Sequence, residues 1–171
     1  MSKHIETISA YNRTARKKSE KKQSLKDRIP AIIYMDAGSN TMIDVDRREF
    51  EAHMRSLEKG RLGNTPICID IEGQKLDVLV KDIQYAKISY NVIHLDLLPV
   101  TDEKMVKVLV PIRYTGQDNS PGMKLGGNLR HVLRQVYVKC QKRHIPSQFV
   151  FDLSSSVIGD SIRLRDLTLP E

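Results

Sequence analysis

The strongest chemical signal in the sequence is a run of cations that ends at an apolar stretch. Residues 13–28 hold eight Lys and Arg residues, and the sequence IPAIIY follows directly. On a helix, cations three and four residues apart share a face and could contact successive phosphates, with a salt-dependent gain from the released counterions. Runs of this kind are also typical of solvated tails. The run alone therefore leaves two alternatives open, a phosphate-binding segment and a tail.

A second candidate lies in the stretch NVIHLDLL. Strand alternation predicts that His94 and Asp96 point to one face, while the other face carries Ile93, Leu95 and Leu97. An imidazole and a carboxylate two residues apart suit the reading of base edges or ribose hydroxyls. An ordinary surface pair is the alternative, and the sequence leaves both open.

The same two side chains could form an acid/base dyad, so a hydrolase is the enzymatic alternative. A hydrolase needs a nucleophile or a metal set beside the dyad, and the sequence has no GxSxG, HExxH or CxxC motif. The stretch KLGGNLR lacks the P-loop spacing and predicts a structural turn. The other histidines stand at no ligand-like spacing: His4, His53, His131 and His144. We therefore expect no enzyme, no cofactor and no metal site.

The net charge of +7 is distributed unevenly. Residues 1–34 hold nine Lys and Arg against three Asp and Glu, residues 35–98 eight against eleven, and residues 99–171 eleven against seven. A concentrated basic field favours polyanions. A membrane surface would require an apolar face among the cations, and the basic run offers only Ala15 and Leu25. Nucleic acid is the expected partner, without a membrane or a small-molecule substrate.

The first residues and the cysteines favour the cytoplasm. MSKHIETISAYNR has no apolar signal-peptide core, and no run in the sequence is long and apolar enough to span a bilayer. Cys68 and Cys140 are too few for a disulfide framework and lack the paired spacing of a zinc site.

The pattern after the basic run is dominated by strands. Alternation and β-branched content predict strands at 29–34, 41–45, 66–72, 75–83 and 91–98. One helix interrupts them, with Asp46 as its N-cap and Glu49 at the position that completes a capping box. We expect its buried face to carry Phe50, Met54 and Leu57, and its end to fall at Gly60.

A second set of strands follows the polar, proline-containing stretch at 97–104, which marks the best domain boundary. These strands are predicted at 105–114, 135–140, 148–153 and 161–167, with Pro111 on an edge strand or at a bulge. Between the first two lies a long turn-rich connection, QDNSPGMKLGGNLRHVL, which is predicted to end in one turn of helix. Two β-rich domains with few short helices are the expected architecture.

Several stretches together resemble one known family in their order and spacing. They are RIPAIIY, LVKDIQY, VIHLDLL, KLGGNLRHVLRQV, HIPSQFVFDLSSSVIGDSI and DLTLP. The family is that of the bacterial large-subunit ribosomal proteins that bind 5S ribosomal RNA, including the general stress protein Ctc, in its long two-domain form. The resemblance covers nearly the whole chain. It implies an N-terminal β-barrel similar to the anticodon-binding domains of glutaminyl-tRNA synthetase, and a smaller β domain after it.

The resemblance also implies phosphate contacts in the basic run. Members of the family dock on the loop E region of 5S ribosomal RNA with cations that precede the PAIIY strand. Many members carry a GKG-type turn and arginines where this chain has RKK and then two lysines, and lysine lacks the bidentate fork of arginine. Phosphate contacts survive that exchange better than base contacts. The implied contacts are Arg13, Arg16, Lys17, Lys21 and Lys22.

The other implied RNA-facing groups come from strands. The PAIIY tyrosine is Tyr34, which could meet a ribose or a base. The VKDIQY stretch matches the family at Lys81 and Gln84, and its H-x-D strand matches His94 and Asp96.

We therefore expect a structural constituent of the large subunit on cytoplasmic ribosomes that binds 5S ribosomal RNA and stabilises the central protuberance. Residues 1–98 would form the RNA-binding barrel and residues 99–171 the second β domain. Neighbouring large-subunit components are the other expected partners, and off the ribosome we expect a monomer. A tRNA-binding or stress-related RNA module, and a protein–protein interaction domain, are the alternatives.

Overall fold

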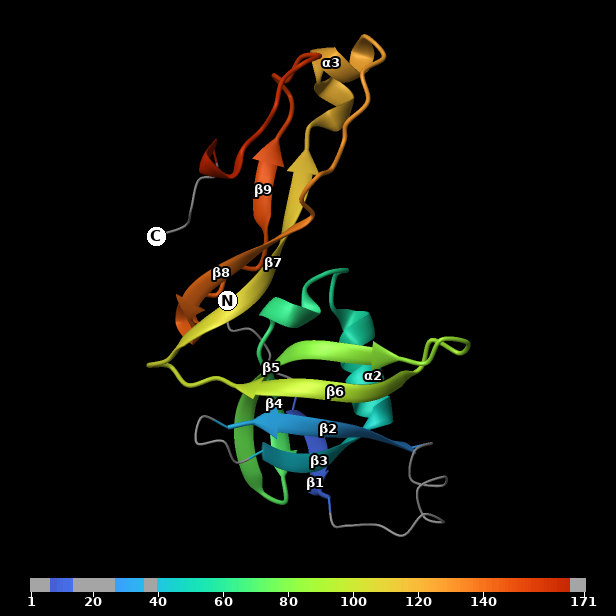
Figure 1. The fold of residues 1–171 in the computed structure, drawn as a ribbon, viewed down its shortest axis with the longest axis vertical. Helices are drawn as coiled ribbons and strands as arrows, with labels where there is room; N and C mark the ends of the chain where they lie inside the picture. Colours follow the sequence, from blue (N-terminus) through green and yellow to red (C-terminus); the bar gives the residue numbers. More distant parts are fainter. Residues whose placement is uncertain (1–6, 14–26, 36–39, 167–171) are drawn as a thin grey trace.

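Six strands from the first part of the chain close into a barrel (Figure 1). The computed structural model describes residues 7–13, 27–35 and 40–166. Around the barrel the order is β1-β3-β2-β6-β5-β4. The predicted mainly β fold is confirmed, and each of the five predicted strands of this part is present, as β2 to β6. The strands are β1 (Thr7–Asn12), β2 (Arg28–Tyr34), β3 (Asn40–Asp46), β4 (Ile67–Ile71), β5 (Gln74–Tyr85) and β6 (Val92–Pro99).

The strand that closes the barrel, β1, has no counterpart among the predicted strands. It pairs in parallel with β4, from Thr7 opposite Cys68 to Ala10 opposite Ile71, and antiparallel with β3. Only Ile8 and Ala10 of β1 are buried. Two inward side chains are too short an alternation to indicate a strand by themselves.

The barrel interior is filled by aliphatic side chains from all six strands. One aromatic ring joins them, that of Phe50 from helix α2 (Arg47–Ser56). Burying each large aliphatic side chain contributes about 1.5–3 kcal/mol, so this cluster is the main source of stability for the barrel. Its members are Ile8, Ala10, Ile29, Ala31, Ile33, Ile43, Val45, Phe50, Ile67, Ile69, Val78, Val80, Val92, Leu95 and Leu97.

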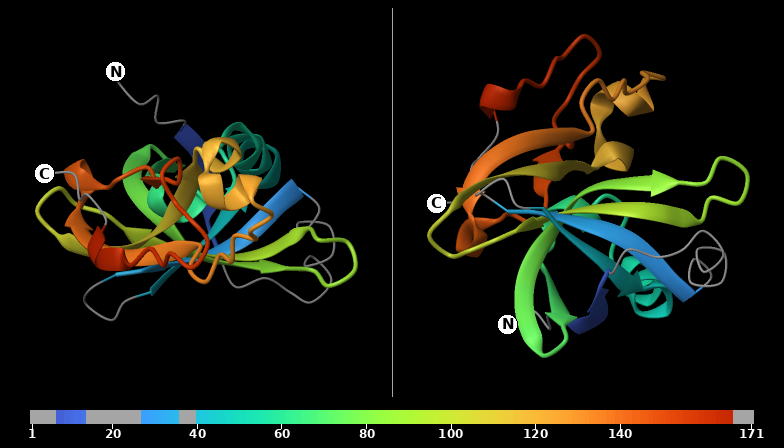
Figure 2. Two further views of the ribbon diagram at one scale, coloured as in Figure 1. Left: turned by 90° about the horizontal axis from the view of Figure 1, so that it is seen from above. Right: turned by 60° about the horizontal axis from the view of Figure 1, so that its bottom comes forward.

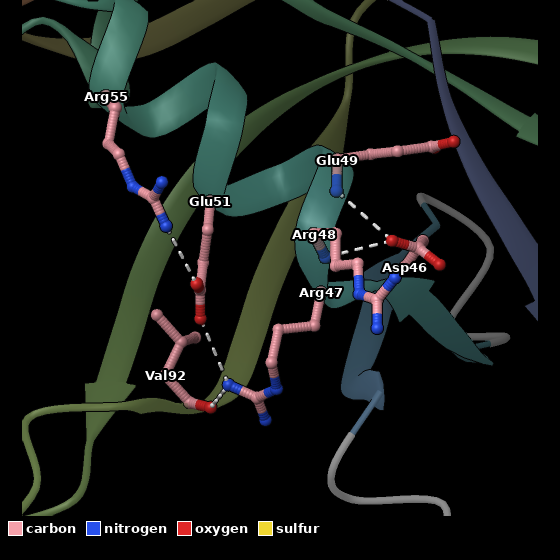
Figure 3. A network of polar contacts seen from close by, with 7 residues as sticks. All are labelled: Asp46, Arg47, Arg48, Glu49, Glu51, Arg55 and Val92. Carbon is pink, nitrogen blue, oxygen red and sulfur yellow. Dashed lines mark hydrogen bonds and ion pairs between the residues drawn. The ribbon is translucent and has the colours of Figure 1, made fainter.

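Helix α2 begins at its predicted cap (Figure 3), and it is tied to two strands. The Asp46 carboxylate accepts hydrogen bonds from the N–H groups of Arg48 and Glu49, at 2.9 and 3.1 Å. The Glu49 side chain does not close a capping box but accepts a hydrogen bond from the Ser9 N–H of β1, at 2.6 Å. Arg47 donates to a β6 backbone carbonyl at 3.0 Å. The helix is thus fixed to the barrel wall at its first turn.

The helix is shorter than predicted. Its last residue is Ser56, and Leu57 is already extended, with φ −85° and ψ 143°. Gly60 lies in the turn that follows and has φ +86°, a conformation that favours glycine. The buried face carries Phe50 and His53, while Met54 packs against the core only in part.

The second part of the chain forms a three-stranded sheet. Its order is β8-β7-β9, with β7 antiparallel to β8 and parallel to β9. The strands are β7 (Met105–Thr115), β8 (Gln135–Gln141) and β9 (Phe149–Asp152). The connection between β7 and β8 holds the short helix α3 (Pro121–Lys124). The turn of helix predicted at the end of this connection is wrong, because α3 lies near its start and residues 127–134 are not helical.

Pro111 lies in the central strand of this sheet, where a missing N–H would ordinarily break a ladder. The partner of β7 changes at this residue. Pro111 is the last residue paired with β8, opposite Gln135, and pairing with β9 starts at Ile112. Pro111 therefore costs no hydrogen bond on the β9 side, which explains why a central strand tolerates it.

The strand predicted at 161–167 is wrong over the residues that the structure describes. The chain there has no strand pairing and ends in a 3-10 turn, η4 (Leu164–Asp166). The Asp166 carboxylate accepts a hydrogen bond from the Arg163 N–H at 2.9 Å, and the Asp166 N–H donates to the Arg163 carbonyl at 3.0 Å. Local bonds from an aspartate have replaced the ladder that the alternation of SIRLRDL predicts.

The two parts lie end to end along the long axis and share a second core (Figures 1 and 2). This core joins Leu79 of β5 and Val100 with side chains of the second sheet. Asn64, which is buried, donates to the carbonyls of Pro146 and Ser147, each at 2.8 Å. Apolar packing and buried hydrogen bonds therefore both hold the sheet on the barrel. Within the described residues, no helix is long and apolar enough to cross a membrane.

Candidate nucleic-acid interface

Three adjacent strands bring four of the predicted RNA-facing residues onto one outer face of the barrel. Strand β6 lies between β2 and β5, so His94 and Asp96 are central. Gln84 of β5 is the direct cross-strand partner of His94. The Tyr34 hydroxyl of β2 donates to Asp96 Oδ2 at 3.4 Å. Residues that are 60 positions apart in the sequence thus form one surface.

A bulge in β5 turns the polar groups of VKDIQY outward. Val80 is paired with Leu97, and the next pair is Asp82 with Asp96, so Lys81 has no residue opposite it. Before the bulge, the even-numbered residue Val80 is buried; after it, Ile83 packs against the core and Asp82 is exposed. One extra residue inverts the side-chain alternation of a strand. The bulge at Lys81 is therefore what brings Gln84 to the same face as His94.

A second irregularity corrects a prediction about β6. The pairing shifts between Gln84 and Tyr85, which skips Ile93. Val92 is buried and Ile93 is 45% exposed, so the prediction that Ile93 shares a face with Leu95 and Leu97 is wrong. An apolar residue in a bulge stays outside the core even though its spacing matches the buried set.

His94 and Asp96 are close to each other, as their spacing predicts. His94 Nδ1 lies 3.1 Å from Asp96 Oδ1, and each side chain is 21% exposed. The contact lacks the alignment of a hydrogen bond, so buried Nδ1 has no hydrogen-bond partner within the described residues. The imidazole is thus mostly buried and lies beside a carboxylate.

The Tyr34 ring joins this pair to a cation. Partial burial raises the pKa of the Tyr34 hydroxyl, and the charge and the hydrogen bond of Asp96 raise it further. The hydroxyl therefore stays a donor at neutral pH. Lys81 Nζ lies 5.1 Å from the centroid of the Tyr34 ring, a cation–π distance. All five predicted strand residues thus belong to one connected cluster, which we call the strand cluster: Tyr34, Lys81, Gln84, His94 and Asp96.

One polar residue of this surface, Asp82, was not predicted from the sequence. Asp82 is exposed and stands directly opposite Asp96, so two carboxylates are cross-strand neighbours. Like charges in that position are destabilising. The signal in the sequence is the pair of polar residues around it, Lys81 and Gln84, but only the bulge shows that Asp82 faces outward.

The predicted cations of the basic run can be placed only in part. Arg16, Lys17, Lys21 and Lys22 lie outside the described residues. Arg13 follows β1, and its N–H donates to the Met42 carbonyl of β3 at 3.1 Å.

That hydrogen bond fixes the position of Arg13 in the strand register of the barrel. Met42 is paired with Ile32, and Ile32 with Asp96. Arg13 is thus level with Asp96, three strand spacings away, which is roughly 14 Å around the wall. The basic run starts level with the strand cluster.

The other end of the basic run is also anchored on the barrel. Arg28, the first residue of β2, is paired with Asp46, and its guanidinium lies 3.9 Å from the centroid of the Tyr11 ring of β1. Because barrel strands stand on both sides of it, the run is an internal connection and not a terminal tail.

A groove lies elsewhere, in the second part of the chain. It has a volume of about 650 Å³ and is lined mainly by apolar side chains, among them Tyr114, Phe151, Leu153, Val157 and Ile158.

Over the described ranges, no three His, Cys, Asp or Glu side chains are grouped so that they could hold a metal. Cys140 packs against the second core, where burial raises the pKa of its thiol.

The geometry defines a class of protein: a barrel with a polar, partly cationic strand face, extended by a small sheet. Two family models cover the chain in succession, the ribosomal L25p family over residues 8–97 and the C-terminal domain of ribosomal protein TL5 over residues 105–171. The chain therefore belongs to the ribosomal L25p family, which is a family of ribosomal proteins and not of enzymes.

Curated relatives agree with the family models over nearly the full chain. A protein of Chlamydia trachomatis serovar A named large ribosomal subunit protein bL25 is 35% identical over 167 residues, which are 98% of this chain and 90% of that protein. A Chlamydia abortus protein of the same name is 36% identical over 166 residues, 97% of this chain and 90% of its own. One from Zymomonas mobilis is 35% identical over 143 residues, 84% of this chain and 64% of the relative.

Proposed function

We propose that this protein is a structural component of the large ribosomal subunit that binds 5S ribosomal RNA through the outer face of β2, β6 and β5. The supporting observation is the strand cluster, in which a tyrosine, an amide, an imidazole and a carboxylate from three strands share one surface beside a lysine. Relatives named for the large ribosomal subunit support the ribosomal part of the proposal. Loop E as the docking region and a role in the central protuberance are implied by the family resemblance.

Two kinds of side chain would contact the RNA: polar groups of the strand cluster and cations of the basic run. Gln84, His94 and Asp96 would test the shape and edges of a non-helical minor groove, with the ring of Tyr34 against a ribose or base. The cations of the basic run would neutralise phosphates and supply most of the affinity. Since Arg13 is level with Asp96, an RNA lying across β2 and β3 could reach both sets.

We further propose that residues 1–98 form the RNA-binding unit and residues 99–171 a second unit. The two are not independent in packing, because Leu79 and Leu98 of the barrel strands lie against the core of the second sheet. Cutting the chain at residue 98 would expose these side chains to water. Binding is therefore best measured on the full chain.

The experiment is a titration of the full chain with 5S ribosomal RNA and with tRNA at several salt concentrations. We expect 5S ribosomal RNA to bind more tightly than tRNA at each salt concentration, because only the former presents the groove that the strand cluster reads. Equal affinity for the two RNAs would contradict specific recognition. An absence of binding to both would contradict RNA binding as the function.

A further inference from the structure

The second sheet carries a cationic face that the proposed 5S interface does not use. In β7 the side chains of Val106, Val108 and Val110 point into the second core. The residues between them point the opposite way, as do the alternate residues of the neighbouring strand β8. We call this outward surface the β7–β8 face; its exposed members include Met105, Lys107, Tyr137 and Lys139.

Two lysines on this face stand directly opposite each other. Lys107 and Lys139 are cross-strand partners, a position in which like charges repel. Neither forms an ion pair with any carboxylate among the described residues. The paired stretches MVKVLVP and QVYVKCQ contain no acidic residue, and neither does any position from 119 to 151. The face therefore holds uncompensated positive charge that an anionic partner would neutralise.

An aromatic ring lies beside the two lysines. Tyr137 is 63% exposed, and Lys107 Nζ lies 4.4 Å from the centroid of its ring. The ammonium covers one side of the ring and leaves the other side for a planar group. A cation-backed aromatic ring next to a further lysine is an arrangement suited to a nucleic acid, with a base on the ring and phosphates on the lysines.

Protection of an exposed sheet edge is the competing explanation. Lysines on edge strands prevent the pairing of sheets, and Lys139 lies on the edge strand β8. That explanation also covers Lys107, because β7 pairs with β9 only from Ile112 onward and no strand of the described residues pairs with the other edge of β7 at Lys107. It does not extend to Tyr137, because an exposed aromatic ring on an edge favours association.

We propose that the β7–β8 face is a second RNA-binding surface, on which Lys107 and Lys139 contact phosphates and Tyr137 stacks on a base. The proposal rests on the proposed function, since the large subunit is taken as the source of the RNA. It is separate from the strand cluster, which lies on the barrel. It gives the second sheet a function of its own, namely contact with ribosomal RNA beyond the one that the barrel binds.

Photo-crosslinking tests the partner directly. Tyr137 is replaced by p-benzoylphenylalanine in the full chain, and a control carries the same group at Leu125, which is 75% exposed in the turn after α3 and outside the sheet. Sedimentation first shows whether each variant enters the large subunit, which tests the proposed function. In assembled subunits we expect position 137 to crosslink to ribosomal RNA and to do so more than position 125. A crosslink from 137 to a ribosomal protein only, or none, would overturn the proposal.

A titration in solution decides the question independently of assembly. The Lys107→Gln/Lys139→Gln double variant and the unchanged full chain are titrated with purified 23S ribosomal RNA at several salt concentrations. Loss of two phosphate contacts should lower the slope of log K against log salt concentration by about 1.4–1.8. The matched control removes two exposed cations that lie outside the sheet, in α3 and just before η4, as Lys124→Gln/Arg163→Gln, and should leave the slope unchanged. Equal slopes for both double variants would refute the role of the lysines.

Discussion

Lys142 Nζ lies 2.5 Å from Asp77 Oδ2, and this contact joins the turn after β8 to β5 of the barrel. The hydrogen bond to Asp77 raises the pKa of the Lys142 ammonium. Asp102 continues the network, because Arg143 donates to its carboxylate at 3.1 Å and lowers its pKa. A chain of charges thus links the second sheet to the barrel at the rim of the shared core.

Removal of this contact should weaken the junction between the two parts. Both side chains are mostly buried, at 21% and 28% exposure, so Lys142→Met leaves the Asp77 carboxylate without its main partner. We expect a loss of about 1 kcal/mol in the free energy of unfolding. Urea denaturation followed by circular dichroism measures it, and Lys124→Met, an exposed site, is the control. An unchanged midpoint for Lys142→Met would show that the contact does not contribute to stability.

Asp96 should control the ionisation of Tyr34. Because burial comes first among the causes of the raised pKa and Asp96 second, Asp96→Asn should lower the pKa of Tyr34 toward 10.0 without reaching it. Because the pKa of Tyr34 is higher in the folded state than in the unfolded state, the stability that this difference contributes is complete below about pH 10. It is lost as the pH rises through the pKa of the folded state. An NMR titration of the tyrosine ring carbons from pH 8 to 12 measures the shift, with Tyr34→Phe to assign the signal. If the titration of Tyr34 is the same in both proteins, the two groups are not in contact in solution.

The bulge at Lys81 allows a sharper test than any single side chain. Deletion of Lys81 would restore regular pairing, because Asp82 opposite Asp96 would then follow Val80 opposite Leu97 directly. Asp82 and Gln84 would stay outward and Ile83 inward, so we expect the deletion variant to fold and to lose only the bulge and the cation. Deletion of Ile83 is the contrasting variant, because it leaves a polar residue, Gln84 or Asp82, opposite the buried Leu95. Burying that polar group costs several kcal/mol, so this variant should be severely destabilised, which thermal unfolding of both variants measures. Severe destabilisation of the Lys81 deletion variant would contradict the assignment of Lys81 as the extra residue.

Salt dependence should separate the groups that read RNA from those that anchor it. His94→Ala or Asp96→Ala removes contacts with base or ribose, so affinity for 5S ribosomal RNA should fall with little change in the salt slope. Lys21→Ala should lower the slope by about 0.7–0.9, the share of one phosphate contact. Titrations at four or more salt concentrations give both quantities. The same slope change in all three variants would contradict the division of roles.

The alternation of side chains predicts most of the barrel, because a strand buried on one face leaves a regular mark on the sequence. Ile29, Ala31 and Ile33 of β2 illustrate this, since these alternate residues are fully buried in a strand that was predicted. Bulges disturb this alternation, and no sequence pattern indicates them. Ile93 is apolar and has the spacing of a core residue, yet the irregular pairing between β5 and β6 leaves it exposed. The closure of the barrel by β1 could not be predicted either, because β1 pairs with Cys68 and Ile69, which are far from it in the sequence.

The candidate site was predictable in its members but not in its construction. The spacing of His94 and Asp96 suffices to place them on one face, and the structure has them 3.1 Å apart. The contact of Tyr34 with Asp96 joins strands that are distant in sequence, and no local pattern encodes it. Asp82 is similar, because its exposure depends on the bulge before it.

The parallel closure of the barrel bears on when the protein can fold during its synthesis. Thr7 pairs with Cys68, so β1 must wait for the ribosome to deliver 61 further residues before its second partner exists. Contacts of such long range slow folding, and until they form, the nascent chain exposes the apolar side chains of its first strands. The highly charged run that directly follows β1 keeps the same early segment soluble by repulsion between chains. The cations would thus protect the growing chain before any RNA is bound.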